Sequence, residues 1–136
     1  TQANKLKLSN IIFINHIPKK YIQSIMEFFD VCYIGWKKNT LYDLGVSPQK
    51  IPEYLFSGKP IIHSYSGKGC VIKKANAGIT IPAEDYELVT NAILKLKGMS
   101  YSARKKLGEN GRRYALKHYD YKKIAKKFDT FIATKV

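Results

Sequence analysis

The sequence has little that would cross-link the chain or anchor it in a membrane. Among its 136 residues are two cysteines, and no stretch approaches the roughly 18 consecutive apolar residues of a membrane-spanning helix. Residues 1–10 lack the apolar centre of a secretion signal. Cys32 and Cys70 have neither the spacing of metal ligands nor the density of a disulfide scaffold. We therefore expect two ordinary thiols, no metal site and a soluble, cytoplasmic protein.

Acidic residues are also few, with 10 Asp and Glu against 24 Lys and Arg, which gives a net charge of +14. Such a balance favours anionic partners, namely nucleic acid, acidic lipid or phosphorylated small molecules, without selecting one of them. Much of the excess lies near the carboxyl end, at Arg104, Lys105, Lys106, Arg112, Arg113, Lys117, Lys122, Lys123, Lys126 and Lys127. A solvated helical face is the simplest interpretation of this cluster.

What the sequence does have is an alternation of two hydrophobic patterns. Apolar content of 45% indicates one globular domain. Continuous apolar runs of strand length alternate with segments whose apolar residues recur at helical spacing. The runs predict strands at 10–14, 31–35, 60–65 and 78–82. The helical pattern falls within about 22–29, 47–57, 70–76, 88–96, 103–118 and 124–132.

Strands that are apolar throughout are buried on both faces, and strand-helix-strand order with short links predicts a parallel sheet. The expected fold class is α/β, a Rossmann-like parallel sheet with flanking helices. Ligands bind such sheets outside the carboxyl ends of the strands, so the loop at 35–47 is a candidate site. Four strands are few for this class, and residues 1–9 resemble the tail of a helix or a linker, so we expect the sequence to be a fragment of a longer protein.

The predicted helix at 47–57 is well delimited by its sequence. Ser47 suits the N-cap, Pro48 the first helical position and Gly58 the left-handed stop. Pro52, however, removes a backbone donor one turn into this helix, which helix propensity does not explain. We interpret it as a sign that function shapes the segment.

Lys50 and Glu53 share one turn of the same helix. A helix N-terminus with a lysine attracts an anion such as a diphosphate, and a glutamate one turn on can accept hydrogen bonds from ribose hydroxyls. The alternative is an exposed pair worth a few tenths of a kcal/mol. The residues alone leave the two interpretations even.

Several motifs together resemble family 4 glycosyltransferases. The resemblance runs from about 10 to 128 and rests on Phe29-Asp30-Val31, a long loop, and the segment from Glu53 to Ile62. Further matches are Gly67-Lys68-Gly69, Ala77-Gly78, Leu107-Gly108 and Gly111-Arg112. Ser47-Pro48-Gln49-Lys50 followed by Glu53-Tyr54 is similar to a subgroup that builds bacterial surface polysaccharides, such as capsule or lipopolysaccharide.

The resemblance implies a GT-B fold of two Rossmann-like domains, of which residues 1–136 correspond to most of the C-terminal, nucleotide-sugar-binding domain. The first strand of that domain and the whole N-terminal domain are then absent. Glu53 would hold the ribose hydroxyls, while Lys50 and the backbone of Gly45, Val46 and Ser47 would face the diphosphate and sugar. The reaction would transfer a sugar, with retention, to a saccharide or lipid-linked acceptor, without a metal or other cofactor. We expect this segment alone to be inactive.

One position departs from the family pattern of two glutamates with seven residues between them. Gly45 occupies the first of these positions, which puts recognition of the sugar hydroxyls in question. A donor-free, structural or regulatory GT-B half is therefore a further interpretation.

Other candidates are weaker. His16 follows the first predicted strand, and Gly67 and Gly69 follow the third, so all three are possible cleft residues. His63 is expected to be a packed, hydrogen-bonded histidine, and His118 to have no chemical role.

A second class of function is a binding module without catalysis, in which the basic helices grip nucleic acid or an anionic membrane. No nucleic-acid motif supports the first form, so nucleic acid is the less favoured partner. The second form is compatible with a transferase located at the inner face of the plasma membrane.

Overall fold

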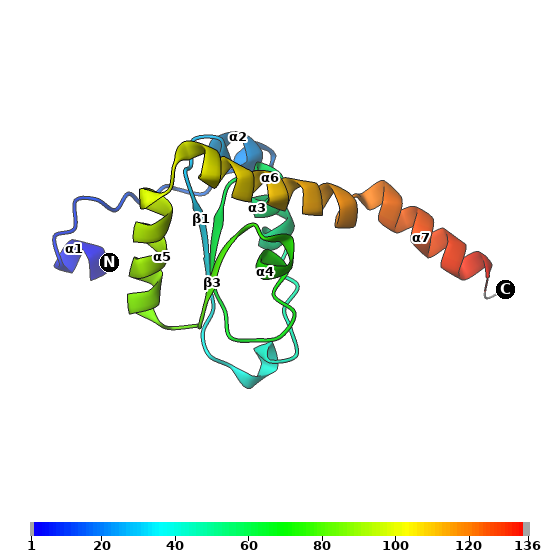
Figure 1. The fold of residues 1–136 in the computed structure, drawn as a ribbon, viewed down its shortest axis with the longest axis horizontal. Coiled ribbons are helices and arrows are strands. Elements are labelled where there is room, and N and C mark those ends of the chain that lie inside the picture. The colour runs from blue at the N-terminus through cyan, green and yellow to red at the C-terminus, as the bar shows by residue number, and fades with distance from the viewer. Residues whose placement is uncertain (1, 135–136) are drawn as a thin grey trace.

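Three short parallel strands form the centre of the structure, a computed structural model that describes residues 2–134 (Figure 1). They are β1 (Cys32–Gly35), β2 (Ile61–Ser64) and β3 (Gly78–Ile81), in the order β1-β2-β3. Cys32 pairs with Ile61, which in turn pairs with Gly78. The α/β class with a parallel, helix-flanked sheet is as the sequence predicts.

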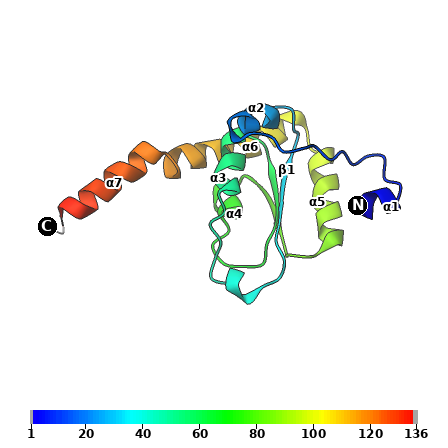
Figure 2. The same ribbon diagram turned by 180° about the vertical axis from the view of Figure 1, so that it is seen from behind.

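Helices cover both faces of this sheet. Their bounds are α1 (Gln2–Lys5), α2 (Ile22–Met26), α3 (Lys50–Ser57), α4 (Val71–Ala75), α5 (Tyr86–Gly98), α6 (Tyr101–His118) and α7 (Tyr121–Ala133), with 3-10 turns η1 (Lys19–Tyr21) and η2 (Thr40–Tyr42). Figures 1 and 2 show α5 on one side of the strands and α3 with α4 on the other. The loops that precede η2 and follow β2 lie together beyond the carboxyl ends of the strands.

The core has two parts because successive strand residues point to opposite faces. Ile61 packs with Ile51, Leu55 and Ile72 under α3 and α4. Its neighbour Ile62 packs with Ile81, Ala92 and Leu96 under α5. All four residues of β2 are buried, as expected for the central strand of a covered sheet.

Glycines let α6 approach α3 closely. A Cβ on Gly108 would overlap the carbonyl oxygen of Gly58, and one on Gly111 would press on Leu55 and Ala77 at 3.1 Å. The glycines at 108 and 111 therefore have a packing role, which accounts for part of the motif noted in the sequence.

The strand expected at residues 10–14 does not form. The segment is extended but irregular, its apolar side chains are exposed, and Ile12 is 83% exposed. Within residues 2–134 no hydrogen bond joins it to β1. A strand is stable only beside a partner that satisfies its backbone groups, and apolar composition does not supply that partner.

Helix α3 begins at Lys50, three residues later than expected. Its N-cap is Gln49, without a side-chain cap, so the prediction of Ser47 as N-cap is wrong. Pro52 then falls in the first turn, where a backbone N–H has no partner within the helix. Its presence needs no functional explanation, and that interpretation is withdrawn. The stop at Gly58 is confirmed, with φ of +70°.

Helix α7 extends away from the sheet and its covering helices (Figures 1 and 2). None of its described residues is buried. Over residues 2–134 we find no helix with the length and apolar content needed to traverse a lipid bilayer.

Candidate functional site

A cavity of about 590 Å³ opens at the carboxyl end of β1, beside the start of α3. It brings together three residues singled out in the sequence, His16, Lys50 and Glu53. The remaining lining residues are Ile17, Lys19, Ile22, Ile34, Gly35, Trp36, Pro48 and Gln49. The place is the one at which open parallel sheets bind ligands.

Two contacts fasten the segment before β1 to the first turn of α3. Lys19 Nζ lies 3.7 Å from Glu53 Oε1, and the amide of Gln23 donates to the Glu53 carbonyl at 2.9 Å. The lysine is largely exposed and the Glu53 side chain about one third so. A solvated pair of this kind contributes little to stability, so the carboxylate is available to a ligand at low cost.

The start of α3 has fewer free amides than an ordinary helix. Pro52 has no N–H, and Ile51 donates its own to the Pro48 carbonyl at 3.2 Å. Attraction for an anion therefore depends mainly on the exposed side chains of Lys50 and Lys19.

A second cavity, of about 780 Å³, shares Lys19, Pro48, Gln49 and Glu53 with the first. Ser47 lines this one, as does Arg112 from α6, which brings a guanidinium charge to the cavity that Glu53 also lines. The sequence placed Arg112 in a motif but not in the site. Its position was not deducible, because it depends on how α6 packs over α3.

Trp36, which sequence reasoning missed, lies in the wall of the first cavity and is held by a chain of hydrogen bonds. Its indole N–H donates to His63 Nε2 at 3.0 Å. His63 Nδ1 lies 3.3 Å from Cys70 Sγ, which is 3.3 Å from the Thr80 hydroxyl. Burial lowers the pKa of His63 to about 4, so the ring is neutral near pH 7. The expected packed histidine is confirmed.

The other cysteine takes no part in this chain. Cys32 is buried in β1, and burial raises the pKa of its thiol. Both cysteines are free thiols, as expected.

Two loops at the carboxyl ends of β1 and β2 are joined tightly. The Tyr65 hydroxyl donates to the carbonyl oxygens of Tyr42 (2.8 Å) and Lys68 (3.1 Å), and the Lys68 amide donates to Asp43. A Cβ on Gly67 would overlap the Tyr42 carbonyl. The close approach of the two loops thus explains why glycine stands at 67.

Gly45 has φ of +116° and donates its N–H to the Tyr42 carbonyl, so it shapes the turn before α3. Gly45 and Val46 are not among the residues that line the two cavities around Glu53. Gly69, with φ of +72°, has open space around its Cα. A third cavity of about 360 Å³ includes Gly67.

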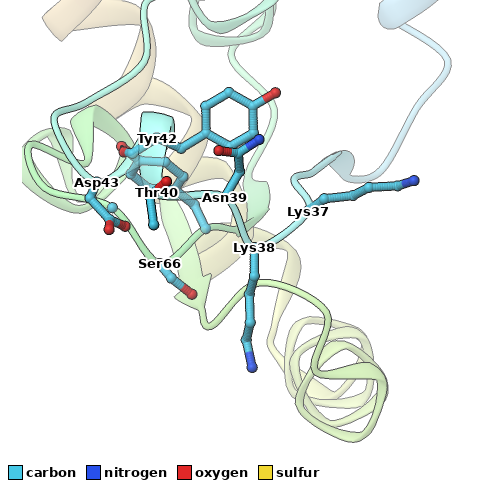
Figure 3. Close-up of a pocket in the computed structure, with 9 residues that line it drawn as sticks. Lys37, Lys38, Asn39, Thr40, Tyr42, Asp43 and Ser66 are labelled. Carbon is cyan, nitrogen blue, oxygen red and sulfur yellow. The ribbon is translucent and has the colours of Figure 1, made fainter.

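Figure 3 shows the residues around this third cavity. The side chains of Lys37 and Lys38 point in different directions, away from the Tyr42 ring, and neither reaches toward Asp43. The cavity's two lysines therefore do not converge on a common point. It is a weaker candidate than the cavity beside α3.

Across residues 2–134, no three His, Cys, Asp or Glu side chains gather closely enough to hold a metal ion.

No protein-family model and no curated protein sequence matches this chain. Among solved structures, it is similar to a sucrose-phosphate synthase from Thermosynechococcus elongatus, with a TM-score of 0.80 and 18% sequence identity. The match covers 98% of this chain and 32% of the synthase, so the chain spans about a third of that protein's length. At this identity the similarity shows the fold alone: the same Rossmann-like α/β arrangement occurs within the larger synthase.

Proposed function

We propose that the chain is the nucleotide-sugar-binding part of a GT-B glycosyltransferase, related to family 4 and acting in the synthesis of a cell-surface polysaccharide. The observation that carries the proposal is the convergence of Lys50, Glu53 and His16 on one cavity beyond β1. Support comes from the fold shared with part of a sucrose-phosphate synthase. The acceptor, a saccharide or lipid-linked saccharide, would be held by a further domain.

Each residue of the cavity has a distinct part in this proposal. Lys50, assisted by Lys19, faces the diphosphate and stabilises the charge that grows on it as the sugar departs. Glu53 exchanges its solvated contact with Lys19 for hydrogen bonds from the ribose hydroxyls. His16 borders the cavity from the opposite segment and closes the nucleoside end.

The residues between β1 and α3 complete the donor site. We assign the backbone of Gly45, Val46 and Ser47 to the sugar side of the diphosphate, with Gly67 and Gly69 on the neighbouring loop. Because Gly45 has no side chain, the sugar hydroxyls would be read by other groups than a carboxylate at this position. The transfer would retain configuration, and lysine charge would replace the charge that a metal supplies elsewhere.

Amide NMR titration with UDP and GDP tests the proposal directly. We expect shifts around Lys50 and Glu53 that saturate with one dissociation constant and identify the preferred base. Lys50→Ala should weaken binding by about 10- to 150-fold, since a charge-assisted contact to phosphate contributes about 1.5–3 kcal/mol. Lys95→Ala, on the exposed surface of α5, is the matched control and should change nothing.

Shifts confined to α6 and α7 that vanish with added salt would instead mean nonspecific anion binding by the basic helices. That result would overturn the donor site and favour the module without catalysis.

We also propose that α7 brings the protein to an anionic membrane surface. Ile124, Phe128 and Ile132 share one exposed face of this helix, while Lys122 and Lys126 lie on the opposite side. A basic, amphipathic helix of this kind lies in the lipid interface, with its apolar face among the acyl chains.

Flotation with vesicles tests the membrane proposal. Binding should rise with the fraction of phosphatidylserine and should fall when Lys122 and Lys126 are both replaced by glutamate. Binding that did not depend on acidic lipid would remove the proposal.

A further inference from the structure

The tryptophan beside the candidate donor site is held unusually well for a residue in a cavity wall. Trp36 follows β1 directly, and its backbone N–H donates to the Ser64 carbonyl at 3.0 Å, which extends the ladder between β1 and β2 by one residue. The main chain at this position is therefore fixed by the sheet rather than by the long loop that follows.

The indole itself is fixed through His63. This histidine is completely buried in β2, and its Nε2 accepts the indole N–H at 3.0 Å. An acceptor at Nε2 requires the proton of the neutral ring to reside on Nδ1, which then donates to Cys70 Sγ. The Thr80 hydroxyl of β3 lies 3.3 Å from the same sulfur and is the last group of the hydrogen-bond chain. One hydrogen-bond chain thus links the cavity wall to both neighbouring strands.

Aromatic neighbours restrict the indole further. Its ring meets the edge of Tyr42 at 5.0 Å between centroids and that of Tyr65 at 6.3 Å, and Tyr65 stacks on His63 at 4.9 Å. These contacts lie on the side of the loops. Trp36 also lines the cavity that holds Lys50 and Glu53.

A fixed ring in a cavity wall, next to a lysine and a glutamate, suits a ligand that carries both a ring and phosphate. Stacking on an aromatic face favours a flat base or the C–H face of a sugar, and a ring already held in place loses little entropy on binding. Among the described residues that line this cavity, the one other aromatic ring is the exposed imidazole of His16, so of these residues Trp36 alone offers an aromatic carbocycle.

We propose that Trp36 is a binding residue that stacks on a ring of the bound nucleotide sugar, and that His63 is the positioning residue that holds the indole for this contact. The inference rests on the proposed function, because it takes its ligand from there. It adds a ring contact that neither the sequence motifs nor the charged residues supply.

Trp36 is the one tryptophan of the sequence, so its fluorescence reports on this wall alone. Titration with UDP, GDP and UDP-glucose should change the emission with the same dissociation constant that NMR gives at Lys50. A change with UDP and GDP would place the base or ribose on the indole. A change with UDP-glucose only would place the sugar there.

Substitutions separate contact from positioning. Trp36→Leu should weaken nucleotide binding about tenfold, whereas Trp36→Phe, which keeps a ring, should weaken it only a few-fold. Tyr86→Leu removes an exposed aromatic ring from α5 and should leave binding unchanged. His63→Leu should shift the emission of the free protein and weaken binding, while His63→Gln, which retains an acceptor, should restore both.

The results distinguish the two proposals. Nucleotide binding that persists at Lys50 while the emission stays constant and Trp36→Leu binds normally would overturn this inference and leave the donor site standing. If the unsubstituted chain binds no nucleotide, both the donor site and the stacking role of Trp36 are overturned.

Discussion

Two apolar segments of nearly equal length have opposite fates in this molecule. Residues 10–14 remain irregular and exposed, while Ile61–Ser64 form the buried central strand β2. The first is the more hydrophobic of the two, since β2 includes a histidine and a serine. The difference is that β2 has a parallel partner on each side and a helix layer on each face. An apolar segment is buried only where partner strands and covering helices surround it, and its hydrophobicity alone does not provide them.

The largest expected effect is on stability, when one isoleucine is truncated in β2 and another in residues 10–14. Ile61→Ala should lower the free energy of unfolding by about 2–5 kcal/mol, because Ile61 is fully buried and the truncation leaves a cavity. Ile12→Ala should change it by less than about 0.5 kcal/mol. Urea unfolding followed by circular dichroism measures both. Equal effects at the two positions would mean that residues 10–14 are packed in solution.

This contrast shows what the sequence predicts well and what it does not. The runs at 31–35, 60–65 and 78–82 were predicted correctly within a residue or so, because each is followed by a helix that covers it. The run at 10–14 is also strongly apolar, but its sequence does not show whether a partner strand lies beside it. Helix α3 was misplaced at its start because Ser47-Pro48 is a good capping pattern that the long preceding loop overrides.

The residues of the candidate site also fall into those that the sequence predicted and those that it did not. Lys50 and Glu53 could be placed together from the sequence because they lie one turn apart on one helix, and the family resemblance then suggested a donor site there. Trp36 and Arg112 were missed because they reach the site through the sheet register and the packing of α6. Contacts made by strands and helices far apart in the sequence carry no local signal, so residues of this kind emerge only from the structure.

The buried histidine of β2 offers a second test of the packed region. The pKa of His63 is about 4 in the folded chain and near 6.5 when the residue is free. The unfolded state binds more protons between these values, so stability is complete above pH 6.5 and falls as the pH drops toward 4. The loss due to this residue should be on the order of 3 kcal/mol.

Urea unfolding between pH 7.5 and 4 measures this loss, with His63→Gln as the reference because it lacks the titrating group. The free energy of unfolding of the chain with His63, relative to that of the His63→Gln variant, should increase toward neutral pH. Parallel pH profiles would show that the histidine is solvated rather than buried.

A smaller effect is expected at the end of α3. Gly58 has φ of +70° and room for a Cβ, so Gly58→Ala adds backbone strain without a clash and should cost about 1 kcal/mol. Gly98, at the end of α5, has ordinary φ and open space. Gly98→Ala should therefore be neutral or stabilise by a few tenths of a kcal/mol. The same Gly→Ala substitution is thus expected to destabilise at Gly58 and not at Gly98. Thermal unfolding of the two variants measures this, and equal unfolding midpoints would mean that Gly58 does not adopt the left-handed conformation.

The smallest effect on global stability is expected at α7, which lies outside the packed region. Asp120 caps this helix by accepting from the backbone amides of Lys122 and Lys123. Ser100 caps α6 in the same manner through Ala103. Ser100→Ala should lower the free energy of unfolding by about 1 kcal/mol, because α6 is packed on α3 and unfolds with it. Asp120→Ala should reduce the helical circular dichroism signal while leaving the unfolding midpoint unchanged, because an unpacked helix frays by itself. A shift of the midpoint by Asp120→Ala would mean that α7 folds against the rest of the chain, and that its apolar face is not open to a membrane.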